Sequence, residues 1–374
     1  MNVLDVPGIT CLVASPEGDL PMTPEMMNVA LDGCDQGTTY GEYFEAIIRM
    51  LARDDRAVLR MLAGSLDRPT PPDAVVVRAE KHGALYHPAS LELVWSQEAE
   101  GKAENDYRPR FAVLTAISPR GRDALRREAL VLERLGQTPG GALLPQPLAL
   151  QDDEAATFLI APWFSGFHEF HVAGDGGFSL WDHDQGTRRL EAEQAREVFF
   201  QAGRILTLCL DPLTGACVHP WSHAAGDFIV RWDENGVQVR LTTARGYAPL
   251  IETENPLSAI LAFVLDLVLR MRLDRVEGVG EWAWLDQKLL HAALSGFYVG
   301  VGEHEKDAEA LRGLAGLLPS FTAEELLEAH ESLPGLFSRA ELETILPRLE
   351  AHCREVATAL RTASRSMDNA GFRR

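Results

Sequence analysis

The sequence predicts an α+β protein of two lobes, a small antiparallel sheet with one helix and then a larger helical lobe, preceded by an N-terminal extension. Short alternating apolar runs dominate residues 73–164, which is typical of strands. Apolar residues at helical spacing recur through much of residues 165–374. The Pro-rich stretch around Pro69 and Pro72 is stiff and cannot continue a helix, so it separates residues 1–72 as a helical extension with a linker.

Composition narrows the class of protein. The chain has 374 residues, of which 46% are apolar and 24% charged, so it can bury a large core. Its net charge of −20 argues against nucleic acid or an anionic membrane as a general partner. Five scattered cysteines without metal-ligand spacing are typical of reduced thiols in a cytoplasmic protein. The longest apolar run, at 259–269, is too short to span a bilayer, and the start of the chain does not read as a signal peptide.

The N-terminal extension contains one expected strand, at 9–14, and two expected short helices, at 40–51 and 55–66. Apolar side chains recur on one face of the first helix. They are Phe44, Ile47, Ile48 and Leu51. Because such a stripe is costly to leave in water, we expect the extension to pack on the lobes or on a partner.

The small lobe is expected to contain three strands, one helix and two further strands. The expected strands lie at 74–78, 91–95, 110–115, 143–150 and 157–160, and the helix at 123–135. The segment 161–166 closes the lobe. Residues 167–189 are rich in Gly and Asp, so we expect an irregular insertion there.

The second lobe begins with an amphipathic helix that Asp211-Pro212 ends, because the residue before proline avoids the α region. A loop at 218–223 carries His219 and leads to two alternating strands joined at Asn235-Gly236, a hairpin signal. Five further helices are expected, at 256–272, 284–298, 308–317, 322–332 and 338–360. The last should kink at Pro347 and begin with a capping box of Ser338 and Glu341.

This order of parts resembles the catalytic core of protein kinases and aminoglycoside-phosphotransferase-like proteins. Three strands, a helix and two strands are the order of a kinase N-lobe, and residues 161–166 are similar to the hinge that follows it. A helix, a His-bearing loop, a hairpin and another loop are the order of the core of the second lobe. The resemblance covers residues 73–272 and implies a two-lobed kinase-like fold.

The resemblance also shows that most of the family's chemistry is missing. The phosphate-binding Lys position falls on Leu114, and the catalytic Asp position falls on Trp221 or Ser222. The Asp-Phe-Gly metal motif aligns with Thr243-Ala244-Arg245, whereas the Asn position matches Asp227, which could still bind a metal. By the resemblance, the residues that would line a nucleotide cleft are Leu114, Ile160, Ala161 and Thr243.

Three functions stay open at this stage. The favoured one is a pseudokinase that needs no cofactor and acts as a regulatory module on a protein partner, since Lys and Mg²⁺ jointly neutralise nucleotide phosphates and both of their sites are degraded. The second is an enzyme of changed chemistry that uses Asp227 with His219, His223 or Glu128 on a nucleotide or small molecule. The third is an ordinary small-molecule kinase, which would use ATP and Mg²⁺.

By the resemblance, Glu128 matches the Glu of the family that holds the phosphate-binding Lys. It lies on the apolar stripe of its helix, and a buried carboxylate needs a partner. Since Leu114 cannot pair with it, Arg245 is its expected partner by the resemblance. His219 is expected to be structural rather than an acid or base.

Two other groups of residues have the composition of a binding site. The cluster of His168, His171, Asp182, His183 and Asp184 suggests a metal, but its spacing favours a solvated loop. The segment Lys81-His82-Gly83 has one glycine where the family has several, so a plain turn is expected.

Overall fold

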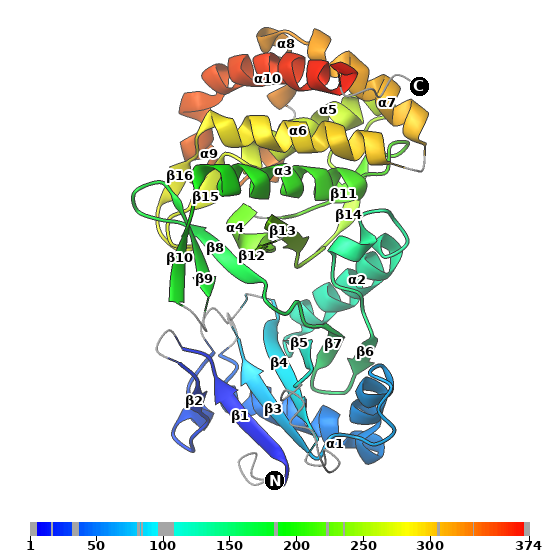
Figure 1. Cartoon of the computed structure of the whole chain (residues 1–374), viewed down its shortest axis with the longest axis vertical. Helices are drawn as coiled ribbons and strands as arrows, with labels where there is room; N and C mark the ends of the chain where they lie inside the picture. Colours follow the sequence, from blue (N-terminus) through cyan, green and yellow to red (C-terminus); the bar gives the residue numbers. More distant parts are fainter. Residues whose placement is uncertain are drawn as a thin grey trace. The chain divides into compact units, whose positions relative to one another are not determined.

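The computed structural model gives an α+β protein that divides into two compact units (Figure 1). Unit 1 comprises Met1–Leu130 and Gln146–Ser165, and unit 2 comprises Val131–Pro145 and Gly166–Arg374. The structure describes residues 6–15, 18–31, 37–80, 83, 85–95, 108–182, 186–221, 224–234, 236–304, 307–331 and 333–369.

A seven-stranded sheet forms the centre of unit 1, in the order β2-β1-β3-β4-β5-β7-β6. The strands are β1 (Ile9–Val13), β2 (Leu20–Pro21), β3 (Ala74–Ala79), β4 (His87–Val94), β5 (Arg110–Ala116), β6 (Ala149–Asp152) and β7 (Thr157–Pro162). The expected order of three strands, a helix (α2, Pro119–Leu135) and two strands is confirmed. The sheet is not purely antiparallel, because β1 pairs parallel to β3 with Cys11 opposite Val77.

The strand expected at 143–150 differs from the structure. Instead of extending over 143–150, it begins at Ala149, and a 3₁₀ turn, η3 (Gly141–Leu143), stands before it. That turn belongs to unit 2, whereas the 3₁₀ turn η2 (Met26–Asn28) belongs to unit 1.

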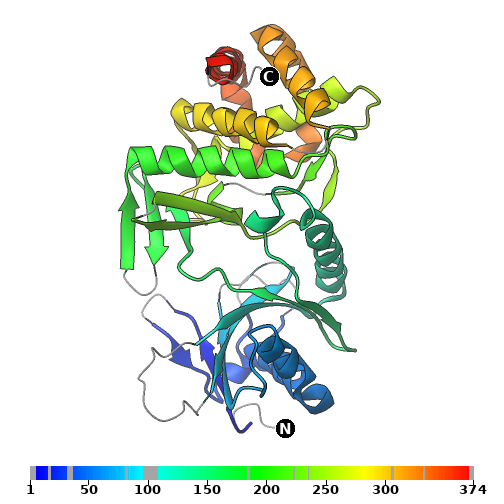
Figure 2. The ribbon, with the colours of Figure 1, turned by 45° about the vertical axis from the view of Figure 1, so that its right-hand side comes forward.

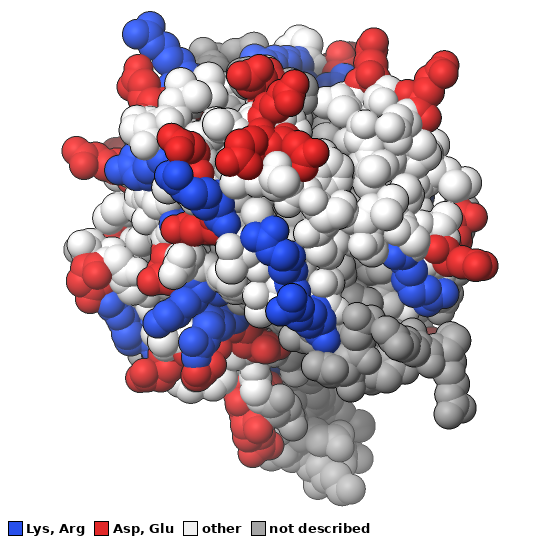
Figure 3. All heavy atoms as spheres, turned by 90° about the horizontal axis from the view of Figure 1, so that it is seen from above, with Lys and Arg blue, Asp and Glu red and all other residues white. Residues whose placement is uncertain are grey.

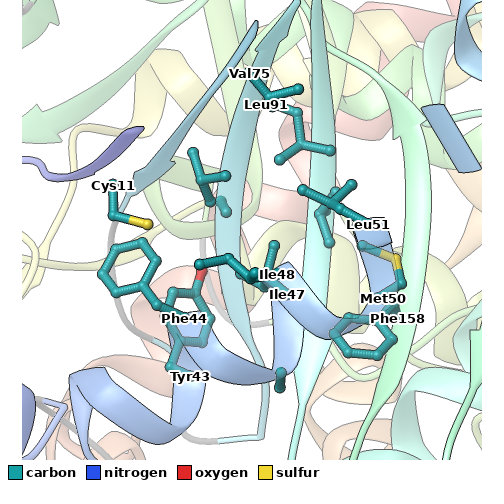
Figure 4. Packing of buried hydrophobic residues seen from close by; sticks show 14 of the residues in the cluster. Cys11, Tyr43, Phe44, Ile47, Ile48, Met50, Leu51, Val75, Leu91 and Phe158 are labelled. Atoms are coloured by element: carbon teal, nitrogen blue, oxygen red, sulfur yellow. The ribbon is translucent and has the colours of Figure 1, made fainter. Parts of the chain in front are cut away.

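The N-terminal residues belong to this sheet and its core. Helix α1 (Tyr40–Gly64) bends where residues 53–56 leave the helical conformation, which confirms the expected pair of helices. Figure 4 shows labelled side chains of α1 together with Cys11, Val75, Leu91 and Phe158 from the strands, and all of them belong to one buried cluster. The expected packing of the extension is confirmed, and residues 72 and 73 do not mark a boundary between the compact units.

A five-stranded sheet forms the base of unit 2, in the order β10-β9-β8-β12-β13. Its strands are β8 (His168–Val172), β9 (Phe178–Asp182), β10 (Gly186–Leu190), β12 (Phe228–Asp233) and β13 (Gly236–Leu241). The expected hairpin is confirmed, with Val230 opposite Val239. The expectation of an irregular insertion at 167–189 is wrong for the described residues. The glycines gather in the turn between β8 and β9, and the strands on either side place Phe170 and Phe178 inward.

Helix α3 (Ala192–Leu208) covers one face of this sheet (Figure 2). On that face the ring of Phe199 contacts the rings of Phe170 and Phe178. Helix α6 (Gln287–Glu303) packs on the other side of α3. The two helices approach so closely at Gly296 that a Cβ atom there would lie 1.9 Å from the carbonyl oxygen of Phe200.

The remaining elements complete unit 2. They are β11 (Ala216–Val218), α4 (Ala224–Asp227), β14 (Tyr247–Pro249), α5 (Pro256–Arg270), β15 (Leu273–Arg275), β16 (Trp282–Trp284), α7 (Ala308–Leu317), η4 (Leu318–Ser320), α8 (Ala323–His330), η5 (Pro334–Leu336), α9 (Arg339–Ile345), η6 (Leu346–Arg348) and α10 (Leu349–Asn369). The expected interruption at Pro347 is confirmed as η6, and Ser338 and Glu341 form the expected capping box.

The surface carries charges of both signs. Figure 3, seen from the end that carries α8 and α10 in Figure 1, shows acidic and basic side chains interspersed with wide areas that carry neither. Among the described residues, no helix has the length and apolar character needed to cross a membrane.

Candidate functional site

Asp227 stands at the end of α4, directly before β12, and its side chain is 1% exposed. The Nη2 atom of Arg245 lies 2.8 Å from its Oδ1 atom. The backbone N and the Oγ1 of Thr242 also donate to the carbonyl oxygen of Asp227, at 2.8 and 2.9 Å. The loop after β13 is therefore tied to the end of α4 by both charge and backbone contacts.

The Asp227–Arg245 pair explains how a carboxylate can be buried here. An isolated ionised carboxylate is costly to remove from water, and a guanidinium offers a charge-assisted hydrogen bond in return. The side chain of Arg245 is 32% exposed, so the cation keeps part of its hydration. The sequence singled out Asp227 as a possible metal ligand and Arg245 as a partner of Glu128, but it did not predict that Asp227 and Arg245 pair, although both flank the same hairpin.

His219 is held by backbone contacts. Strands β11 and β14 pair with Val218 opposite Tyr247, and the N–H of His219 donates to the carbonyl oxygen of Gly246 at 3.1 Å. Burial lowers the pKa of His219, Asp266 opposes this, and Arg270 lowers it further. The imidazole is therefore neutral at pH 7.

The catalytic Asp position, counted from His219, is occupied by a core residue. Trp221 is 3% exposed, and its ring lies edge-on to Phe228 with centroids 6.1 Å apart. An indole cannot accept a proton from an acceptor hydroxyl. The other residues considered at this loop, Ser222 and His223, lie outside the described residues.

Beside this loop lies a buried ionic network that sequence reasoning did not find. Arg270 is buried on α5 and bonds to Asp266 at 2.9 Å, one turn earlier on the same helix. Its Nη2 donates to the carbonyl oxygen of Leu336, and its Nη1 lies 3.7 Å from Glu341. The spacing of Asp266 and Arg270 by four residues was the available signal. The network joins α5 to α9.

In unit 1, Glu128 is fully buried, as the apolar stripe of its helix indicated. The hydroxyl of Tyr86 donates a hydrogen bond to its carboxylate. Glu128 therefore has a partner inside unit 1, as Arg245 has inside unit 2. Their pairing with each other would join the two units and stays a prediction.

The predicted cleft-lining residues do not share one face. On paired strands β5 and β7, Val113 is opposite Ile160 and Ala112 is opposite Ala161. Since side chains alternate along a strand, Leu114 and Ala161 lie on one face and Ile160 on the other. Ile160 is fully buried in the cluster with α1, and its place at a nucleotide cleft stays a prediction. Thr243, in unit 2, is buried.

The histidines of the expected metal cluster, His168 and His171, do not lie together. His168 lies 3.6 Å from Asp182, and His171 lies 3.4 Å from Glu169, on opposite faces of β8. Within the described part of the chain, no group of three or more His, Cys, Asp or Glu residues could hold a metal ion. His183 and Asp184 lie outside that part, as do Lys81 and His82 of the expected turn.

Comparisons with known proteins do not assign the chain to a family. No protein-family model matches the chain, and no curated protein matches it. Among solved structures it is similar to Rad53 1–466 in complex with AMP-PNP, with 14% identity and a TM-score of 0.31. The match covers 76% of this chain and 63% of that chain, so the chain spans less than two thirds of its length. A likeness at this TM-score carries no argument about function.

Proposed function

We propose that this chain is a kinase-like protein that does not transfer phosphate and that acts as a binding or regulatory module on a protein partner. The observation that carries this proposal is the Asp227–Arg245 ion pair. The one carboxylate left at a metal-binding position is already neutralised by a cation of the chain itself.

The chemistry of the pair supports this reading. Arginine is always protonated in proteins, so its charge at Asp227 is permanent. A Mg²⁺ ion at Asp227 would have to displace the guanidinium or lie within a few ångströms of a like charge, which is strongly unfavourable. The residues present therefore do not fit a Mg·ATP site, and no phosphotransfer step follows from them.

Two other positions support the same proposal. Leu114 has no donor for a phosphate, and Trp221 has no atom that accepts a proton. The kinase-like character itself is supported by element order. Strands β3-β4-β5-β7-β6 are neighbours in that order with α2 between β5 and β6, and the β12–β13 hairpin follows the His219 loop.

Calorimetry on the full chain tests the proposal. We expect Mg·ATP to bind more weakly than about 1 mM, roughly −4 kcal/mol. We also expect no transfer of labelled phosphate to the protein or to small-molecule acceptors. Asp227→Asn serves as the matched control, since it removes the carboxylate but keeps its shape, and it should behave like the unmodified chain in both assays.

The alternative, an atypical phosphotransferase that uses Asp227, predicts the opposite results. A dissociation constant for Mg·ATP at or below the micromolar range, roughly −8 kcal/mol, would contradict the proposal. So would phosphate transfer that Asp227→Asn abolishes.

A further inference from the structure

The β12–β13 hairpin carries two arginines on the same face of the sheet. Arg231 is opposite Gln238, and Ile229 is opposite Arg240, so the two arginines are diagonal neighbours across the strands. The intervening Val230 and Val239 point to the other face, which α3 covers, and both are buried. Both arginines therefore lie on the face away from α3.

One aromatic ring holds both guanidinium groups. The Cζ atom of Arg231 lies 5.1 Å from the centroid of the Phe167 ring, and that of Arg240 lies 5.2 Å from it. Each distance is typical of a cation–π contact. Phe167 thus brings two positive charges close together. An anion bound between them would remove the repulsion between these charges.

The charges at this place are not balanced. Arg231 has an acidic neighbour, since its Nε lies 3.3 Å from Asp233, and its Nη2 donates to the Oε1 of Gln238 at 2.7 Å. Arg240 donates only to the carbonyl oxygen of Val239, at 3.0 Å, and forms no ion pair within the described part of the chain. Burial and the charge of Arg231 both lower the pKa of Arg240.

Several donors here are open to a ligand. The amide oxygen of Gln238 accepts from Arg231, which leaves the amide nitrogen as a donor. The Nε of Arg231 is buried beside Asp233, so its terminal nitrogens are the atoms that a ligand can meet. The side chain of Arg231 is nevertheless 38% exposed, so a ligand can reach the guanidinium.

We propose that Arg231, Gln238 and Arg240 bind the phosphate group of a small soluble organic phosphate without a metal ion. Paired arginine forks match the geometry and charge of phosphate oxygens. The acidic net charge disfavours an anionic polymer or membrane as the source of the phosphate. The site needs neither Asp227 nor Mg²⁺, so it goes beyond the function proposed above.

Pyrophosphate is the probe for this site. We expect saturable one-to-one binding to the full chain by calorimetry, at about 50 mM salt and with EDTA present. Arg240→Gln and Arg231→Gln should each weaken it at least tenfold. Arg188→Gln is the matched control, because this arginine also stacks on a ring, that of Trp232, but lies on the α3 side of the same sheet. It should change affinity less than twofold.

A second variant keeps the test decisive if an arginine variant does not fold. Gln238→Glu places a carboxylate between the guanidinium groups, so it should abolish pyrophosphate binding while the thermal midpoint stays equal or rises. The proposal is overturned if the unmodified chain shows no saturable binding up to about 10 mM. It is also overturned if Arg188→Gln weakens binding as much as Arg240→Gln. Asp227→Asn should leave pyrophosphate binding unchanged, which separates this result from the phosphotransfer assays.

Discussion

The Nη2 atom of Arg245 lies 2.8 Å from the Oδ1 atom of Asp227, and this contact joins the loop after β13 to the end of α4. Asp227 is buried whereas Arg245 is partly exposed, so the two ends of the pair differ in what they lose when the partner is removed. Removing Arg245 should therefore cost more stability than removing the charge of Asp227, and unfolding experiments can measure the cost.

Arg245→Leu should lower the free energy of unfolding by about 2 kcal/mol, because it removes the guanidinium from a buried carboxylate. The value is below that of a fully buried pair since water screens part of the guanidinium. The double variant Asp227→Asn with Arg245→Leu should recover much of the loss in urea unfolding. Arg339→Leu removes one member of an exposed pair with Glu343 and should have little effect. Additive losses in the double variant would contradict the coupling.

Gly296→Ala should destabilise the packing of α3 on α6. The new Cβ would lie 1.9 Å from the carbonyl oxygen of Phe200, so the helices must separate, at a cost of about 1–3 kcal/mol. Gly313→Ala on α7 is the matched control, because its Cβ meets no atom within 4 Å. It should stabilise the protein by up to about 1 kcal/mol, through helix propensity alone. In thermal unfolding, the midpoint should fall for Gly296→Ala and should rise or stay equal for Gly313→Ala.

Stability should fall in mild acid because of two buried histidines. Burial lowers the pKa of His330 to about 4, and burial, His330 and Arg272 lower that of His352 well below 6.5. Their rings lie 6.0 Å apart, and both nitrogens of His352 have no hydrogen-bond partner in the described part of the chain. Between pH 6.5 and about 4 the unfolded state therefore binds more protons than the folded state. The stability is complete above pH 6.5 and is lost as pH falls.

Urea unfolding at several pH values measures this effect. Each histidine should contribute a slope of about 1.4 kcal/mol per pH unit in that window. His330→Leu should remove its share of the slope, whereas Thr358→Ala, an exposed change on α10, should keep the full slope. A stability curve that stays flat from pH 6.5 to 5 would rule this explanation out.

Removing residues 1–70 should give a protein that aggregates. The deletion takes away β1, the neighbour of β3, and α1, whose Phe44, Ile47 and Leu51 are fully buried against the sheet. It therefore exposes both a strand edge and the apolar face of the sheet. Size-exclusion chromatography and binding of a hydrophobic dye would detect this. A truncated chain that is monomeric and as stable as the full chain would be inconsistent with the packing of α1.

The sequence by itself determined those elements whose signal lies within a few neighbouring residues. The hairpin from Phe228 to Leu241 follows from alternation and a turn signal, and the break in α1 follows from the apolar stripes on either side of it. The inward position of Glu128 was also readable, since it depends only on helical period. The strands β8 and β9 were missed because a glycine-rich turn masked the alternation beside it.

Only the tertiary structure decided which distant residues meet. The pairing of β1 with β3 brings together residues more than sixty positions apart, and no local pattern specifies such a register. Ile160 and Ala161 alternate between the two faces of β7, but only the packing of α1 decided that the face with Ile160 joins its buried cluster. Arg245 bonds to Asp227 because the β12–β13 hairpin returns the chain to the residue where it began. A charged side chain takes the partner that the backbone brings within reach, and that distance is set by the packing of the whole unit.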